Sequence, residues 1–266
     1  MFIDFSKISF VDDFMFCTVL EDKEQCQEFL ERVLGKKIAK LDLSQKQLVI
    51  DTRYESKGIR LDVYVEDTDG NVYDIEIQTV KVGDIGKRSR YYHSEMDSYQ
   101  IRKGAKYKEL KQSIVIFVCT FDPVGEGRCV YTFRNTCQED KRHVLDDERT
   151  TILLNTKGDR TGINKNLSNL LEYIETGRAV DEYTRALEHQ VQVIREDDDW
   201  RKRYMTLEMK LDEKLEEGMA IGIEQGILKS IGFLLDTGMS IEESIAKVAK
   251  GYDYSEEEVL KIWKTR

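Results

Sequence analysis

Asp62, Glu76 and Gln78 are polar side chains whose spacing could place metal-binding chemistry on one face of a β-sheet. They lie in two runs, 59–65 and 72–78, in which apolar and polar residues alternate. Because successive side chains of a strand point to opposite faces, each run predicts a β-strand with one polar face. The polar face of the second run consists of Asp74, Glu76 and Gln78.

An Asp69-Gly70 pair separates the two runs, and such a pair is a strong signal for a hairpin turn. In a hairpin, the polar side chains of both strands can converge. Two neighbouring carboxylates repel each other unless a cation lies between them. Mg²⁺ prefers oxygen ligands and retains waters, so Asp62, Glu76 and a substrate phosphate could hold it. The ion would lower the pKa of a bound water and stabilise charge on the phosphate.

Spacing alone leaves a second interpretation open, because antiparallel strands also alternate when one face simply meets solvent. Further motifs occur around the hairpin in a fixed order. They are Asp12-Asp13-Phe14-Met15-Phe16, Arg60-Leu61-Asp62-Val63, Ile75-Glu76-Ile77-Gln78, Arg88-Ser89-Arg90-Tyr91-Tyr92, Tyr99-Gln100-Ile101-Arg102-Lys103-Gly104 and Tyr107-Lys108-Glu109-Leu110. In this ordered set, over about residues 5–135, the chain resembles the PD-(D/E)XK nuclease superfamily. It most closely resembles the Rpn family of recombination-promoting nucleases, also described as putative transposases.

The resemblance implies a restriction-endonuclease-like fold and an Mg²⁺-dependent DNA endonuclease, with Mn²⁺ as a substitute ion. It implies that Asp62 and Glu76 bind the metal and that Gln78 stands where most of the superfamily has lysine. A glutamine amide can position water but adds no positive charge. More of the electrostatic stabilisation would then fall on the metal and on nearby arginine or lysine side chains.

Asp13 is a further candidate ligand, because the resemblance implies that an acid can come from the first helix. Asp12 and Asp13 have a second interpretation as the N-cap and the acidic first turn of that helix.

A basic and aromatic segment follows the second strand directly. DNA binding needs cations for the phosphates, and amide or aromatic groups help to position the strand. The resemblance favours Arg88, Tyr92 and Gln100 here, and Arg90 and Lys103 could also contact phosphate. Alternatively, the tyrosines of this segment pack on the sheet while its cations face water.

The pattern along the chain predicts an α/β fold with a mixed sheet, in which a three-strand antiparallel meander is followed by a helix and a returning strand. The expected helices are 11–34, 84–111, 164–175, 181–217, 241–249 and 256–264. The expected strands are 47–52, 59–65, 72–78, 113–119, 128–134 and 151–154. We predict a nuclease-like domain at 1–160 and a helical C-terminal region at 161–266.

The composition of the 266 residues bounds the function only loosely. The net charge of −10 argues weakly against nucleic acid, although acidic residues are sparse in the segment 87–111. The five cysteines include no CxxC pair, which favours a reduced, cytoplasmic protein without a zinc site. Neither a signal peptide nor a membrane span is predicted.

Glycines repeat every four residues at Gly218, Gly222 and Gly226. Such spacing lets helices approach closely, and the glutamates nearby argue against a membrane segment. We expect helix packing here, with a homodimer through the C-terminal helices as one form of it. The last two helices could also resemble a helix-turn-helix, but their acidic character favours packing.

Three functions therefore remain open. The leading hypothesis is the metal-dependent DNA endonuclease, acting in recombination or transposition. The second is a catalytically inactive nuclease fold that binds DNA or a protein. Gln78 in place of lysine and the net negative charge both favour this hypothesis. The third is a recombination factor that needs a partner protein.

Overall fold

The Asp69-Gly70 turn connects two antiparallel strands, β4 (Val63–Asp67) and β5 (Val72–Gln78), as the sequence predicts. Gly70 has a φ of 85°, a left-handed conformation that glycine adopts without steric cost. The Asp67 carboxylate accepts hydrogen bonds from the backbone N–H groups of Asp69 and Asn71. The hairpin therefore has a fixed register, in which Val63 lies opposite Ile75.

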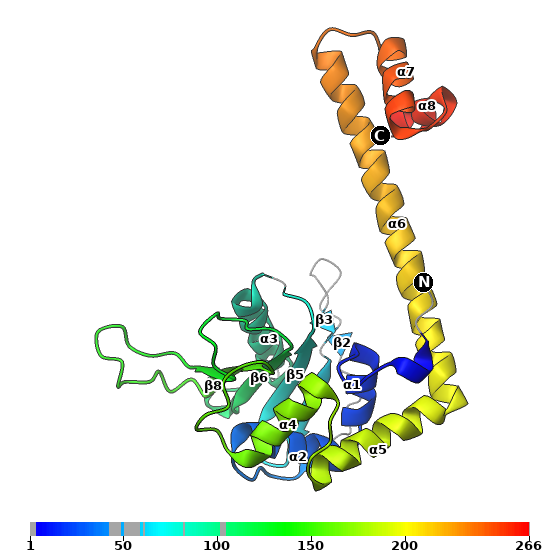
Figure 1. Cartoon of the computed structure of the whole chain (residues 1–266). Helices are drawn as coiled ribbons and strands as arrows, with labels where there is room; N and C mark the ends of the chain where they lie inside the picture. The colour runs from blue at the N-terminus through cyan, green and yellow to red at the C-terminus, as the bar shows by residue number, and fades with distance from the viewer. Residues whose placement is uncertain are drawn as a thin grey trace. The chain divides into compact units, whose positions relative to one another are not determined.

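The computed structural model describes residues 4–42, 49–50, 59–60, 62–81, 83–101 and 105–265 (Figure 1). The chain divides into two compact units, Met1–Asp198 and Asp199–Arg266. The predicted boundary at residue 160 stays a prediction, although the first unit includes two helices beyond it, α4 (Lys165–Thr176) and α5 (Glu182–Glu196).

The first unit is an α/β fold around a six-stranded mixed sheet in the order β1-β4-β5-β6-β8-β7. Strand β6 pairs in parallel with β5 and β8, and the other pairs in this sheet are antiparallel. The remaining members of the sheet are β1 (Leu41–Asp42), β6 (Ser113–Cys119), β7 (Val130–Phe133) and β8 (Arg149–Asn155). Strands β2 (Val49–Ile50) and β3 (Ile59–Arg60) form a separate two-stranded ribbon. The predicted fold class is confirmed.

Helices cover both faces of this sheet (Figure 1). Helix α3 (Ile85–Gln100) packs on one face, where its Tyr92 and Met96 join the apolar side chains of β6. The other face lies under α1 (Asp13–Leu20), α2 (Lys23–Leu34) and α4, and α5 packs against these helices. All seven residues of β6 are buried, as expected for a continuous apolar strand in the middle of a sheet.

Four predicted elements differ from the observed ones. The helix expected at 181–217 is divided into α5, which ends at Glu196, and α6 (Asp198–Asp236), because Asp197 leaves the helical conformation as the C-cap of α5. The helix expected at 11–34 breaks after α1, because the Asp22 carboxylate accepts from Glu24 N and Gln25 N and so begins α2. The strand expected at 59–65 is divided between β3 and β4, which pair with different partners. The helix expected at 84–111 ends at Gln100, and within the described part of the remainder there is only a short 3₁₀ turn, η2 (Tyr107–Glu109). A further 3₁₀ turn, η1 (Phe5–Lys7), precedes α1.

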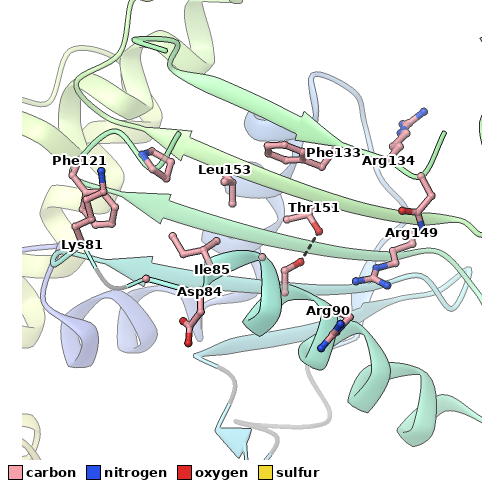
Figure 2. Close-up of a pocket in the computed structure, with 15 residues that line it drawn as sticks. Lys81, Asp84, Ile85, Arg90, Phe121, Phe133, Arg134, Arg149, Thr151 and Leu153 are labelled. Atoms are coloured by element: carbon pink, nitrogen blue, oxygen red, sulfur yellow. Dashed lines mark hydrogen bonds between the residues drawn. The ribbon is translucent and has the colours of Figure 1, made fainter. Parts of the chain in front are cut away.

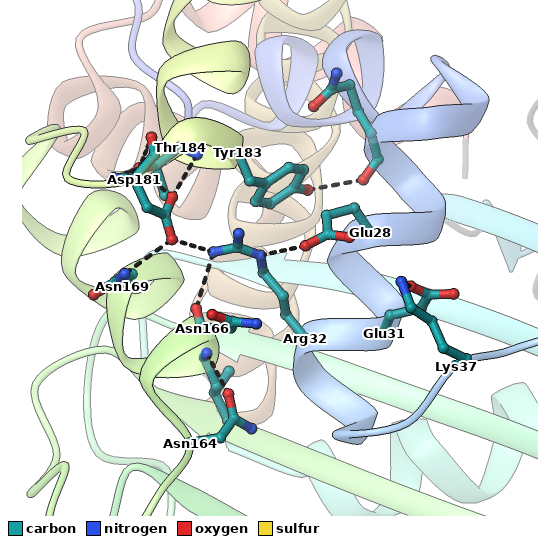
Figure 3. Close-up of polar contacts among 12 residues, drawn as sticks. Glu28, Glu31, Arg32, Lys37, Asn164, Asn166, Asn169, Asp181, Tyr183 and Thr184 are labelled. Atoms are coloured by element: carbon teal, nitrogen blue, oxygen red, sulfur yellow. Dashed lines mark hydrogen bonds and ion pairs between the residues drawn. The ribbon is translucent and has the colours of Figure 1, made fainter.

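Arg32 ties three helices of the first unit together (Figure 3). Its guanidinium donates to Glu28 Oε1 at 2.8 Å and to Asp181 Oδ2 at 2.7 Å, and it also reaches the carbonyl of Asn166 at 3.1 Å. The guanidinium also stacks 4.4 Å from the ring centre of Tyr183. We call these residues the Arg32 cluster, and it links α2, α4 and the start of α5.

The second unit contains most of α6 (Asp198–Asp236), together with α7 (Ile241–Tyr252) and α8 (Glu256–Lys264). Both short helices begin with capping boxes, at Ser240 with Glu243 and at Ser255 with Glu258. The apolar residues buried between the three helices are Ile227, Ile231, Ile245, Val248, Ala249 and Val259. By length and composition alone, α6 is apolar enough to cross a membrane, and little of that stretch is buried in the structure.

Candidate active site

The structure brings Asp62, Glu76 and Gln78 together at the end of the central hairpin. The backbone N–H of Asp62 donates to Glu76 Oε1 at 3.2 Å. In return, the backbone N–H of Ile77 donates to Asp62 Oδ2 at 3.3 Å. This reciprocal pair follows from the register, because Asp62 directly precedes β4 and comes to lie beside the second half of β5.

Arg88 reaches this pair of acids from the first half of α3. It donates from Nη2 to Glu76 Oε2 at 3.0 Å and from Nη1 to Gln78 Oε1 at 2.7 Å. Tyr92 lies one turn further along the same face of α3, and its hydroxyl accepts from Arg88 Nη2 at 2.9 Å. Two residues predicted to contact DNA are therefore buried or half-buried parts of the acidic site.

The Gln78 side chain is held at both ends of its amide. Its Oε1 accepts from Arg88, and its Nε2 donates to the backbone carbonyl of Ile77 at 2.7 Å. The neutral amide is thus in direct contact with a guanidinium that is always charged. The positive charge that the sequence lacks at position 78 is present one hydrogen bond away.

Asp74 is a third acid at this site, and the sequence interpretation did not assign it a role. It is 0% exposed, and neither of its carboxylate oxygens has a hydrogen-bond partner within the described part of the chain. Burial, followed by the charges of Glu76 and Asp62, raises the pKa of Asp74 well above its ordinary value. The available signal was its place on the polar face of β5, two residues before Glu76.

Glu76 is also difficult to ionise in the absence of a metal. Burial and the neighbouring Asp62 raise the pKa of Glu76 to about 8, although hydrogen bonding and Arg88 act in the opposite direction. One guanidinium, that of Arg88, therefore lies among three acids. A single positive charge is too little to neutralise all three carboxyl groups if they ionise. Strong perturbation of this kind is typical of functional sites.

A family model described as PD-(D/E)XK nuclease family transposase matches residues 10–158, more than half of the chain. The chain belongs to this family. This family corresponds to the Rpn nucleases and putative transposases, which the chain resembles in its motifs. No curated protein and no solved structure matches the chain.

The acids of this PD-(D/E)XK protein fit a divalent cation by their chemistry. Asp62 and Glu76 offer oxygen ligands, the buried Asp74 carboxyl group lies beside them, and Mg²⁺ commonly binds through one or two carboxylates plus water. Among the described residues, no set of three or more His, Cys, Asp or Glu side chains is arranged to hold a metal by itself. Water and substrate phosphate would therefore have to complete the coordination.

The other predicted site residues of this PD-(D/E)XK protein lie in different surroundings. Asp12 caps α1 by accepting from Phe14 N, and Asp13 lies in the first turn of that helix, so its role as a ligand stays a prediction. Gln100 donates to the carbonyl of Gly70 at 2.9 Å and so ties the end of α3 to the hairpin turn. Arg90 is exposed on α3, and Lys103 lies outside the described residues.

Proposed function

We propose that the chain is an Mg²⁺-dependent DNA endonuclease that hydrolyses phosphodiester bonds, with Asp62 and Glu76 as metal ligands. The observation that supports this proposal is the convergence of both acids with Gln78 and Arg88 in a member of a nuclease family. The family implies DNA as substrate and typically uses divalent metals, and Mn²⁺ should replace Mg²⁺. Asp13 is proposed as an additional ligand from α1.

The residues of the site divide the chemistry between them. Asp62 and Glu76 would hold the ion, which when bound activates a water and stabilises charge on the phosphate. Gln78 orients the attacking water, since one donor of its amide remains after the bond to the Ile77 carbonyl. Arg88 supplies the positive charge that a lysine at position 78 would supply, and Tyr92 fixes the guanidinium in place.

DNA contacts outside the metal site come from the basic segment, in which Arg90 is exposed and Lys103 lies outside the described residues. We assign phosphate contacts to Arg90 and Lys103, because arginine and lysine side chains in such positions neutralise the backbone of nucleic acids. Gln100 acts here through the hairpin turn, which it holds by its bond to Gly70. The protein is expected to act in the cytoplasm.

Cleavage of supercoiled plasmid DNA in the presence of Mg²⁺ or Mn²⁺ tests the proposal directly. Glu76→Gln keeps the shape of the side chain and removes the charge that binds metal, so we expect cleavage to fall by at least about 100-fold. Asp140→Ala is a matched control, because that acid lies on the surface and pairs with Arg142. Unchanged cleavage by Glu76→Gln would refute the assignment of the site.

A catalytically inactive module that binds DNA or a protein is the second candidate. The bond between Arg88 and Glu76 Oε2 favours it, because a guanidinium already compensates one of the two proposed ligands. Titration calorimetry with Mn²⁺ separates the candidates. Uptake that disappears in Asp62→Asn supports the enzyme, and the absence of any uptake supports the binding module.

The family description also names a transposase, so we propose a role in DNA recombination or transposition. We further propose a homodimer through the C-terminal helices. Gly226 has a role inside the chain, because an added Cβ would lie 2.7 Å from the Tyr252 hydroxyl, whereas Gly218 and Gly222 have open space around them. Sedimentation of Gly222→Leu tests the dimer, since a bulky side chain would separate closely packed helices.

A further inference from the structure

A groove of about 680 Å³ lies beside the first half of α3, over the strands β8 and β7 (Figure 2). It is separate from the acids, because Arg88 and Tyr92 face Glu76 on β5 whereas Ser89 and Arg90 line the groove. Its volume is within the range of roughly 300–1,000 Å³ that is usual for sites of small organic ligands. The groove has no part in the proposed metal site.

The floor of the groove is apolar and partly aromatic. Ile85, Phe121, Phe133 and Leu153 line it, and Figure 2 shows the Phe133 ring and the Leu153 side chain over neighbouring strands. Phe133 is 49% exposed, so a large part of its ring is available to a ligand. An exposed ring of this kind can stack with a nucleobase of any sequence.

Cations surround this floor. Arg90 and Arg149 lie near each other at one end of the groove, and Lys81 lies at the other end (Figure 2). None of the three forms an ion pair within the part of the chain that the structure describes. Asp84 is the only acid among the lining residues, so the groove as a whole favours an anionic ligand.

A buried polar network fixes the groove against the sheet. The hydroxyls of Ser89 and Thr151 lie 2.6 Å apart, and His93 contacts Thr151 Oγ1 at 3.1 Å and Ser113 Oγ at 2.8 Å. Burial and the charge of Arg149 lower the pKa of His93 to about 3, so the imidazole is neutral and acts as a structural link. The wall from α3 and the floor from β8 are thus held in one arrangement before any ligand binds.

We propose that this groove binds one unpaired nucleotide of the DNA substrate, with its base on the aromatic floor and its phosphate at Arg90 and Arg149. This inference rests on the proposed function, which it extends by naming the substrate class. Base pairs inside a duplex hide their faces by stacking, so a duplex could use the cations of the groove but not its floor. A cationic groove with aromatic platforms is the combination that single-stranded nucleic acid requires.

The groove lies close enough to the acids for one bound DNA strand to reach both. Strands β5 and β8 are the two neighbours of β6, so they lie about 10 Å apart at roughly 4.8 Å per strand spacing. Helix α3 lies over this interval and presents Arg88 to one side and Arg90 to the other. We therefore expect preference for DNA with unpaired nucleotides close to the cleaved bond, such as single strands, flaps or gaps.

The test uses the full-length Glu76→Gln variant in EDTA, which separates binding from cleavage. Fluorescence anisotropy with a labelled single strand and with the matching blunt duplex should give tighter binding of the single strand. Adding Phe133→Ala should weaken single-strand binding about 5- to 150-fold, the range measured for loss of one stacked base, and leave duplex binding nearly unchanged. Phe133→Trp should retain the preference. Adding Arg149→Ala should weaken both ligands and reduce the salt dependence of binding.

Two matched substitutions control for the loss of an aromatic ring or of a charge. Phe233→Ala removes an exposed ring of α6, and Arg185→Ala removes an exposed charge of α5, and neither should alter the preference. Equal affinity for both ligands, or no effect of Phe133→Ala, would overturn the groove assignment even if the wild type cleaves DNA. A preference that depends on Phe133 in a protein without cleavage would support the groove and refute the proposed nuclease.

Discussion

Arg32 and Arg88 both lie inside the first unit, but their surroundings differ in charge. Arg32 is 7% exposed and bonds directly to two carboxylates, Glu28 and Asp181 (Figure 3). Arg88 bonds to one carboxylate, Glu76, while Asp62 and Asp74 lie close to that same acid. Arg32 thus bonds directly to both of its acids, whereas Arg88 bonds to only one of the three acids around it.

The pKa values of the acids show what this difference means. Burial alone would raise the pKa of Asp181, but hydrogen bonds from Thr184, Asn169 and Arg32 outweigh it and hold the pKa well below the ordinary value. At Glu76, burial and Asp62 outweigh Arg88 and the pKa rises. The Arg32 cluster therefore stabilises the fold, whereas the acids near Arg88 cost stability, as is common at functional sites.

The largest expected effect is the loss of the Arg32 side chain. Arg32→Met should reduce the free energy of unfolding by about 3–5 kcal/mol, because it leaves Asp181 charged and partly buried without its cation. Arg88→Met should cost about 1–2 kcal/mol, because Glu76 can take up a proton instead, and it should abolish cleavage. Urea unfolding of both variants measures the difference. Equal losses of stability would remove the distinction between the two sites.

The next effect is a dependence of stability on pH that comes from Glu76. The pKa of Glu76 is about 8 in the folded protein, against an ordinary value of 4.5 that applies to the unfolded chain. Between pH 4.5 and 8, therefore, Glu76 is ionised in the unfolded chain and protonated in the folded protein. Stability contributed by Glu76 is thus highest below about pH 4.5 and falls as the pH rises towards 8. Thermal unfolding in EDTA should show this decline in the wild type.

Two variants test the source of that decline. Glu76→Gln should flatten the profile between pH 4.5 and 8, since the amide does not titrate. Asp181→Asn should instead flatten the acid limb, because the lowered pKa of Asp181 contributes stability that is present above pH 3.8 and lost as the pH falls below it. A neutral-range decline that persists in Glu76→Gln would assign it to another group.

A third and smaller effect is a gain of stability on removing charge from Asp74. Asp74→Asn keeps the volume of a side chain that is fully buried without a hydrogen-bond partner among the described residues. As the pH rises through the raised pKa of Asp74, the substitution removes repulsion from Glu76 and Asp62, so the melting temperature of the metal-free protein should there rise by a few degrees, about 1 kcal/mol. Its affinity for Mn²⁺ should fall. A lower melting temperature would mean that Asp74 has a stabilising partner.

The sequence predicted the strands of the site better than its electrostatics. Alternation and the Asp-Gly turn were enough to place Asp62, Glu76 and Gln78 together, because both signals are local in the chain. Asp74 has the pattern of a solvent-facing polar residue, but it is fully buried in the folded chain. The opposite environments of Arg88 and Arg90 depend on how α3 is rotated on the sheet, which the basic composition of the segment does not specify.

The Arg32 cluster had no signal in the sequence for a related reason. Arg32 has the pattern of a charged residue on an amphipathic helix, and its partner Asp181 lies 149 residues further along the chain. Likewise, the division of the strand predicted at 59–65 depends on a change of strand partner. Contacts between distant segments decided these two features, and local periodicity does not record them. The break before α2 differs, because the Asp22 cap that causes it is local in the chain.

The smallest expected effect comes from an arginine on the surface, and it sets the scale for the comparison. Arg142 bonds to Asp140 at 2.8 Å, as short as the bonds of Arg32, but its side chain is 89% exposed. Water already solvates both charges there, so Arg142→Met should change the free energy of unfolding by less than about 0.5 kcal/mol. Urea unfolding beside Arg32→Met measures it under identical conditions. A loss comparable to that of Arg32→Met would show that bond geometry, rather than burial and the balance of neighbouring charges, separates the arginines of this chain.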